Sequence, residues 1–143
     1  MSEHFRRLER MYASAPINEY FAPRLHIPDA GVAELRLRVR PEFYHAAHAA
    51  HGAVYFKALD DATFFAANSL VEDVFVLTTS FTLYLTRPVN EGEIIATGRV
   101  VSHSKRLTIA EGVLVDARGR EIARGSGTFM PSTKPLSPEI GYR

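Results

Sequence analysis

Two adjacent acidic residues, Asp60 and Asp61, lie in the middle of the most apolar segment of the chain. This segment, residues 52–70, reads GAVYFKALDDATFFAANSL, with five alanines and no proline, which predicts a helix buried on most sides. Burial of an unpaired carboxylate either costs free energy or raises its pKa. These side chains could act as a general base or a nucleophile, or they could reach solvent or accept backbone hydrogen bonds.

The residues that open this helix could supply the second part of a site. Gly52 follows His51 and lets a ligand approach the backbone closely. The free N–H groups of a first helical turn can polarise a carbonyl group, as an oxyanion hole does. Nine residues of helix span about 13 Å, which is too far for both features to serve one carbonyl within one subunit. If the two features cooperate, their spacing predicts a dimer whose helices lie antiparallel and share each site.

Three histidines, His45, His48 and His51, precede this helix at three-residue spacing. On a helix they could supply zinc ligands, but no carboxylate stands at a matching spacing and their segment is expected to be a loop. We therefore expect hydrogen-bonding histidines of an active site and no metal. The chain has no cysteine, which excludes disulfides, thiolate metal sites and cysteine nucleophiles.

The rest of the chain has an ordinary composition. Its 143 residues suffice for one core, so we expect a single domain over residues 1–143, with a helix within residues 1–15 and a loose tail over residues 131–143. A net charge of +1 gives no indication of a nucleic-acid partner. The N-terminus does not read as a secretory signal, and no stretch reaches the roughly 20 apolar residues of a membrane span. We expect a cytoplasmic protein without a membrane partner.

Segments that read as strands flank the apolar helix. Residues 32–40 alternate apolar and polar side chains and end at Pro41. After the helix come four segments rich in Val, Ile, Leu, Thr and Phe, separated by short turns: 74–89, 93–104, 106–116 and 120–130. Short turns predict an antiparallel meander, and only the apolar helix can cover such a sheet. The expected fold class is α+β, a curved antiparallel β-sheet wrapped around a central α-helix.

A series of short motifs follows this order of elements. They are HGA at 51–53, LD at 59–60, AANS at 66–69, TTSFTLYLTRP at 78–88, VNEGE at 89–93, and VDARG at 115–119 followed by ARGSGT at 123–128. Their order and spacing resemble the hotdog-fold acyl-CoA thioesterases of the phenylacetyl-CoA thioesterase type, over about residues 16–130. The resemblance implies a hotdog fold, hydrolysis of acyl-CoA without a cofactor, and a homodimer or a dimer of dimers.

The resemblance also implies which residues act on the thioester. Asp60 matches the catalytic carboxylate of the family, as general base or nucleophile, and Asp61 is the alternative. Thr78 matches a position that often carries a hydroxyl group near the attacking water, with Thr79 as its alternative.

The start of the helix matches the family with two departures. Gly52 and Ala53 match the residues whose N–H groups hold the thioester oxygen, and His51 matches a histidine that orients the loop or the carbonyl. Ala53 stands where the family usually has a second glycine. His45 and His48 stand where it has asparagine and glycine, so His45 could donate a hydrogen bond in place of the amide, or could alter the reaction or the acyl preference.

A basic turn could bind the phosphates of coenzyme A. Lys105 and Arg106 carry charges that suit phosphate, although a solvated turn explains them as well. We count them, with Asp61, Thr79 and His48, as candidate substrate-binding residues.

Two other functions fit parts of the pattern. An acyl-thioester dehydratase or hydratase would pair one of the histidines with an acid across the dimer, and a non-catalytic protein would bind acyl-CoA without turnover. The helix that runs from histidine-glycine to aspartate favours hydrolysis over the first. The absence of an appended DNA-binding segment in the sequence argues against a sensor.

Overall fold

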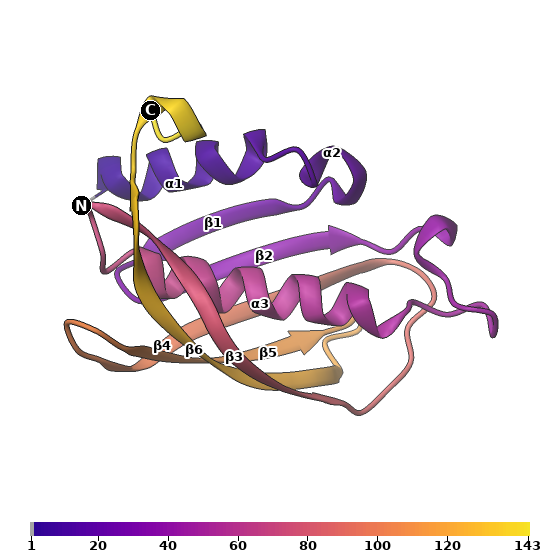
Figure 1. Cartoon of the computed structure of the whole chain (residues 1–143). Coiled ribbons are helices and arrows are strands. Elements are labelled where there is room, and N and C mark those ends of the chain that lie inside the picture. Colours follow the sequence, from indigo (N-terminus) through magenta and orange to yellow (C-terminus); the bar gives the residue numbers. More distant parts are fainter. Residues whose placement is uncertain (1) are drawn as a thin grey trace.

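The computed structural model describes residues 2–143, which form one curved sheet with a helix in its hollow (Figure 1). The sheet has the order β1-β2-β4-β5-β6-β3, and all neighbouring strands are antiparallel. The helix α3 (Gly52–Asn68) contacts every strand of the sheet. The expected α+β architecture, a curved antiparallel sheet around a central helix, is confirmed. The strands are β1 (Arg24–Asp29), β2 (Val32–Arg38), β3 (Val74–Leu85), β4 (Glu93–His103), β5 (Thr108–Val115) and β6 (Glu121–Pro135).

The alanines of α3 let the helix lie unusually close to the sheet. Ala58, Ala62 and Ala66 are fully buried. Opposite them, Gly98 of β4 has no side chain, and a Cβ atom built there would stand 2.5 Å from the carbonyl group of Ala62. The main chain of α3 at Ala62 thus packs directly on the main chain of β4 at Gly98, and this contact fixes the position of α3 relative to the sheet.

A buried asparagine joins the end of α3 to β3. The Asn68 amide donates to the carbonyl oxygens of Val71 and Val74, both at 3.1 Å, and its Oδ1 accepts from the Val76 N–H at 3.0 Å. These bonds satisfy backbone groups that the chain reversal leaves without partners. They set where β3 begins relative to α3, and therefore which side chains of β3 face the helix.

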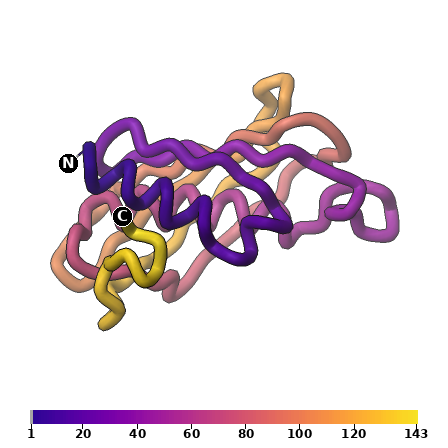
Figure 2. Tube along the Cα trace, turned by 90° about the horizontal axis from the view of Figure 1, so that it is seen from above, coloured from indigo at the N-terminus to yellow at the C-terminus, as the bar shows by residue number. Residues whose placement is uncertain are grey.

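The two ends of the chain lie side by side over α3 (Figures 1 and 2). The helix α1 (Ser2–Ser14) buries Leu8 and Met11, and the one-turn helix α2 (Asn18–Phe21) follows it. The C-terminal segment contains the short 3-10 helix η2 (Pro138–Ile140) and packs beside α1. Another 3-10 helix, η1 (Pro41–Phe43), lies in the loop before α3.

The structure corrects several expected boundaries. The last strand extends to Pro135 instead of ending at Met130, and the segment 131–143 is packed against the protein, so the expected loose tail is wrong. β6 pairs with β5 only as far as Phe129, so beyond it the strand has a partner on one side and tolerates prolines. β3 ends at Leu85 and not at residue 89, and β1 was not expected.

Within residues 2–143 no helix is both long and apolar enough to cross a membrane.

Candidate active site

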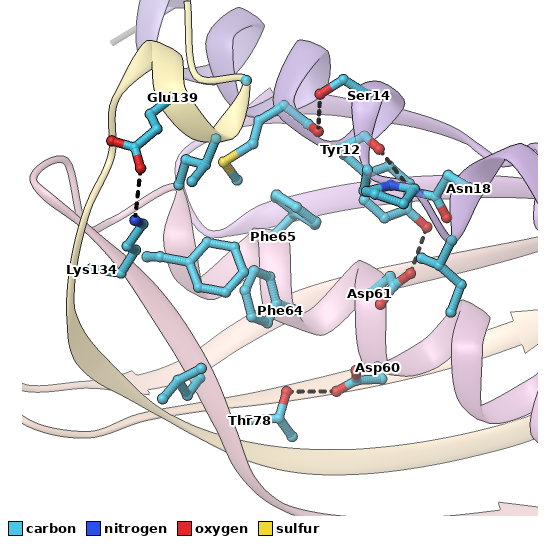
Figure 3. Close-up of a pocket in the computed structure, with 18 of the residues that line it drawn as sticks. Tyr12, Ser14, Asn18, Asp60, Asp61, Phe64, Phe65, Thr78, Lys134 and Glu139 are labelled. Carbon is cyan, nitrogen blue, oxygen red and sulfur yellow. Dashed lines mark hydrogen bonds and ion pairs between the residues drawn. The ribbon is translucent and has the colours of Figure 1, made fainter.

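A cavity of about 810 Å³ lies beside the middle of α3 (Figure 3). Four parts of the chain form it: the end of α1 with the turn that follows, α3, β3, and the chain from Lys134 to the C-terminus. Of the residues singled out in the sequence, Asp60, Asp61 and Thr78 line this cavity. Much of the remaining wall is apolar: Met11, Ile17, Phe64, Phe65, Phe75, Leu77 and Ile140.

Asp60 and Thr78 lie together, as the sequence predicts. Thr78 Oγ donates a 2.8 Å hydrogen bond to Asp60 Oδ1, across from α3 to β3. Burial raises the pKa of Asp60 from 3.8 to about 6; the negative charge of Asp61 adds to the rise, while the Thr78 bond and Lys57 oppose it. A carboxylate with this pKa, facing a cavity, can accept a proton near neutral pH.

The neighbouring acid, Asp61, has two partners of its own. Its Oδ2 accepts from the Tyr12 hydroxyl at 2.6 Å and pairs with Lys57 Nζ at 2.7 Å. Burial raises the pKa of Asp61 despite these partners, and it also raises the pKa of Tyr12 far above its ordinary value. The surroundings of the two acids differ, because Asp61 is already paired with Lys57 while Asp60 accepts a hydrogen bond only from an uncharged hydroxyl.

Lys57 and Tyr12 were not predicted from the sequence as members of the site. The four-residue spacing of Lys57 and Asp61 on one helix is a signal that could have found the ion pair. Tyr12 lies 49 positions away from Asp61, and only the packing of α1 on α3 brings it near.

The start of α3 differs in detail from the expected oxyanion hole. His51 is the N-cap residue, and its Nδ1 accepts the Ala53 N–H at 2.9 Å, so the neutral ring carries its proton on Nε2. The Ala53 N–H, expected to hold a thioester oxygen, therefore already donates its hydrogen bond to His51. For the Gly52 N–H, no acceptor is found among residues 2–143. The structure thus favours Gly52 as the donor available to a ligand, with His51 shaping the turn.

The loop before α3 holds the other two histidines. His45 Nδ1 accepts the Ala47 N–H at 3.0 Å, and this bond closes a tight turn. His48 has a φ angle of 64°, the left-handed region where glycine is favoured, which explains why the resembled family has glycine at this place. In the described part of the chain no cluster of three His, Asp or Glu side chains is arranged to hold a metal ion.

Three further candidates lie away from the cavity. Thr79 Oγ bonds Thr128 of β6, at 2.7 Å to its hydroxyl, where the pairing of β3 with β6 is irregular between Thr78 and Ser80. Thr79 thus does not line the cavity that Thr78 lines. Lys105 and Arg106 lie in the β4–β5 turn, at the end of the sheet where α3 finishes, and neither lines the cavity (Figure 1).

The fold and the acid on its enclosed helix define a protein of the hotdog class. The thioesterase superfamily model matches residues 48–123, more than half of the chain, and the protein belongs to that superfamily. The matched part contains Asp60, Thr78 and the start of α3, and it leaves out α1 and the C-terminal segment.

Solved structures have the same fold. The PaaI protein of Escherichia coli, from the phenylacetic acid degradation operon, aligns with 95% of this chain and 98% of its own at 18% identity, with a TM-score of 0.86. A thioesterase family protein from Silicibacter pomeroyi aligns with 89% of this chain and 96% of its own at 25% identity, with a TM-score of 0.82. A thioesterase from Haemophilus influenzae covers 85% of both chains at 12% identity, with a TM-score of 0.77. No curated protein sequence matches the chain.

Proposed function

We propose that this protein hydrolyses acyl-CoA thioesters, with Asp60 as the catalytic carboxylate. The observation that carries the proposal is the setting of Asp60: its pKa is raised, it faces a largely apolar cavity, and it accepts a hydrogen bond from Thr78, whereas Asp61 is already paired with Lys57. Membership of the thioesterase superfamily supplies the reaction class. The apolar wall suits an acyl group, and the free N–H at the start of α3 suits a developing oxyanion.

In the proposed reaction, Asp60 accepts a proton from a water molecule held with the help of Thr78. The water oxygen bonds to the thioester carbonyl carbon, and negative charge develops on the carbonyl oxygen. The N–H of Gly52 stabilises that charge. The carbon–sulfur bond then breaks, and the proton passes from Asp60 to the sulfur of coenzyme A.

Asp60 could alternatively attack the carbonyl carbon itself and form a mixed anhydride that water hydrolyses. Label found in Asp60 after single-turnover hydrolysis in ¹⁸O-labelled water would establish the covalent route. Water attack on an anhydride at its acyl carbon leaves ordinary oxygen in the protein, whereas attack at the Asp60 carbonyl puts the label there. Accumulation of an acyl-enzyme would establish the covalent route, and its absence together with an unlabelled Asp60 would favour the general base.

We propose that the working unit is a homodimer, because each site needs the start of one α3 and the middle of a second α3. Gly52 and Asp60 are eight residues apart on one helix, about 12 Å along its axis, so Gly52 of a partner subunit must meet Asp60. β3 is an edge strand of 12 residues with exposed Leu77, Tyr84 and Leu85. A long apolar edge of this kind favours pairing with a second copy.

The first experiment measures release of coenzyme A from short, long and aromatic acyl-CoAs. Asp60→Asn is expected to lower kcat by at least about 100-fold, because the amide cannot accept the proton. Asp61→Asn is the matched control, since it changes the adjacent charge and keeps the proposed base. Wild-type activity in Asp60→Asn would refute the assignment. Hydration of enoyl-CoA without thioester hydrolysis would indicate a dehydratase, and tight binding without turnover would indicate a binding protein.

Mixed dimers test the shared site. Asp60→Asn and Gly52→Pro are each expected to be inactive alone. After unfolding and refolding together, half of the dimers combine one chain of each kind, and each such dimer has one intact site, so roughly a quarter of wild-type activity should return. No recovery, with confirmed exchange of subunits, would place both groups of a site in one chain and refute the dimer arrangement.

A further inference from the structure

We propose that the C-terminal segment, residues 136–143, forms the far wall of the acyl site and limits the length of the uncharged, apolar acyl group that the enzyme accepts. This inference rests on the proposed function for the role of Asp60. It adds a substrate class and assigns a specificity-determining role to a part of the chain that the family model does not match.

The cavity runs from the catalytic acid to this segment. In Figure 3, Asp60 and Thr78 lie at one side, Glu139 of η2 at the opposite side, and Phe64 and Phe65 between them. Both phenylalanines and the C-terminal segment line the same cavity. An acyl group whose carbonyl carbon is held at Asp60 would therefore extend along the rings towards η2.

The lining favours an acyl group without charge. Phe64 lies between two other rings, with its centroid 4.9 Å from that of Phe65 and 5.1 Å from that of Phe75. Both lysines on the cavity wall already have acidic partners: Lys57 pairs with Asp61 at 2.7 Å, and Lys134 with Glu139 at 3.5 Å. A carboxylate at the end of an acyl chain would meet aromatic rings and these neutralised pairs along most of the wall, and these do not compensate its loss of hydration. The remaining cation of the wall, Arg143, belongs to the C-terminal segment at the far end.

Two contacts hold the C-terminal segment on α1, and a third joins α1 to α3. The Tyr142 hydroxyl bonds His4 Nδ1 at 2.7 Å, and His4 Nε2 donates to the carbonyl oxygen of Asn68 at 3.0 Å, where α3 ends. The main-chain carbonyl of Arg143 accepts a hydrogen bond from Arg10. The segment is thus tied through α1 to the same helix that carries Asp60.

The turn at Gly141 brings the segment close to α1. Its φ angle is +94°, which an L-residue rarely adopts, and a Cβ atom there would collide with Ser14 Oγ. Just before this turn, Ile140 lines the cavity. Backbone conformation, hydrogen bonds and packing therefore all place one apolar side chain at the end of the proposed acyl site.

The test compares the acyl-chain profile of three proteins: the wild type, a chain that ends at Ser137, and Ile140→Trp. Specificity constants, kcat/KM, are measured for straight-chain acyl-CoAs from acetyl to palmitoyl. Truncation should raise kcat/KM for the longest chains by about tenfold or more and leave acetyl-CoA unchanged, because the far wall is removed. Ile140→Trp should shift the preference to shorter chains, since the larger ring fills the cavity. Succinyl-CoA should be a poorer substrate than butyryl-CoA for all three.

An unchanged chain-length profile in both variants, with folding verified by circular dichroism, would overturn the inference. If the wild type hydrolyses no acyl-CoA, the proposed function fails, and titration with decanoic and palmitic acids then decides the inference by itself. In that case, weaker binding of decanoic acid by Ile140→Trp and tighter binding of palmitic acid by the truncated chain would support a binding site closed by this segment. Equal affinities in the three proteins would refute it.

Discussion

Replacing Asp60 with asparagine is expected to stabilise the fold as well as abolish activity. Burial raises the pKa of Asp60 from 3.8 to about 6. At neutral pH, where the side chain is charged, it therefore destabilises the folded state. A shift of about two pKa units corresponds to about 3 kcal/mol of folding free energy. Asparagine carries no charge at any pH, and its Oδ1 can still accept the hydrogen bond from Thr78.

The effect should depend on pH in one direction. Because the folded-state pKa is raised, the wild type is most stable where Asp60 is protonated, and it loses stability as the pH rises through about 4 to 6. The gain in Asp60→Asn should therefore be about 2–3 kcal/mol at about pH 8 and close to zero at about pH 4. Urea unfolding of both proteins at these pH values measures the difference in free energy of unfolding.

Asp116→Asn supplies a control of opposite sign. Burial of Asp116 acts to raise its pKa, but hydrogen bonds from the Arg120 and Arg118 backbone and from the Arg120 guanidinium outweigh it, and the pKa is lowered. Its replacement should therefore destabilise the protein at about pH 8. Equal stability of wild type and Asp60→Asn at about pH 8, or a larger gain at about pH 4, would refute the account of a carboxylate held at an energetic cost for catalysis.

Three further predictions concern the site and its loop. The kcat/KM of the wild type should rise with pH through about 6 as Asp60 loses its proton. Asp61→Asn should move the midpoint of this rise to lower pH, because it removes a negative neighbour and leaves Lys57 unpaired. A midpoint that rises or stays fixed in Asp61→Asn would contradict the proposed base. His48→Gly should increase the free energy of unfolding by about 1 kcal/mol in urea titrations, since it relieves a φ of 64°, while His48→Ala should bring no such gain. Gly52→Pro should lower kcat by about 100-fold with the helix intact, because proline at the first helical position removes the free N–H. Gly52→Ala keeps this N–H and should retain activity. Comparable rates in the two variants would exclude the Gly52 N–H as the donor.

The central helix and its acid could be predicted from the sequence because both depend on local patterns. An apolar segment rich in alanine predicts a buried helix, and two acids within it are conspicuous. The pairing of Asp60 with Thr78 followed from motif positions in the resembled family, and the structure places the two groups in contact. The predicted meander is wrong at its first strand: β4, β5 and β6 follow one another, but β3 pairs with β6 and not with β4.

The parts that escaped prediction depend on partners distant in sequence. β1 contains Pro28 and buries only Ile27, so its six residues lack the alternation of a half-buried strand; as an edge strand it tolerates the proline. Tyr12 reaches Asp61 only because α1 packs on α3. Residues 131–143 contain three prolines, which indicate a loop, but nothing local shows that Tyr142 binds His4.

The close contact of α3 with β4 has a consequence for how the enzyme tolerates change. Gly98 lies on the sheet, away from the cavity, and it determines how deeply the helix sits. A methyl group there would push the carbonyl of Ala62 outward, and Asp60, only two residues earlier on the same stiff helix, would be displaced from Thr78 with it. The geometry of the proposed site therefore depends on the smallest residue of a strand that does not line the cavity, and variation is expected to be rarer at this contact than in the terminal segments.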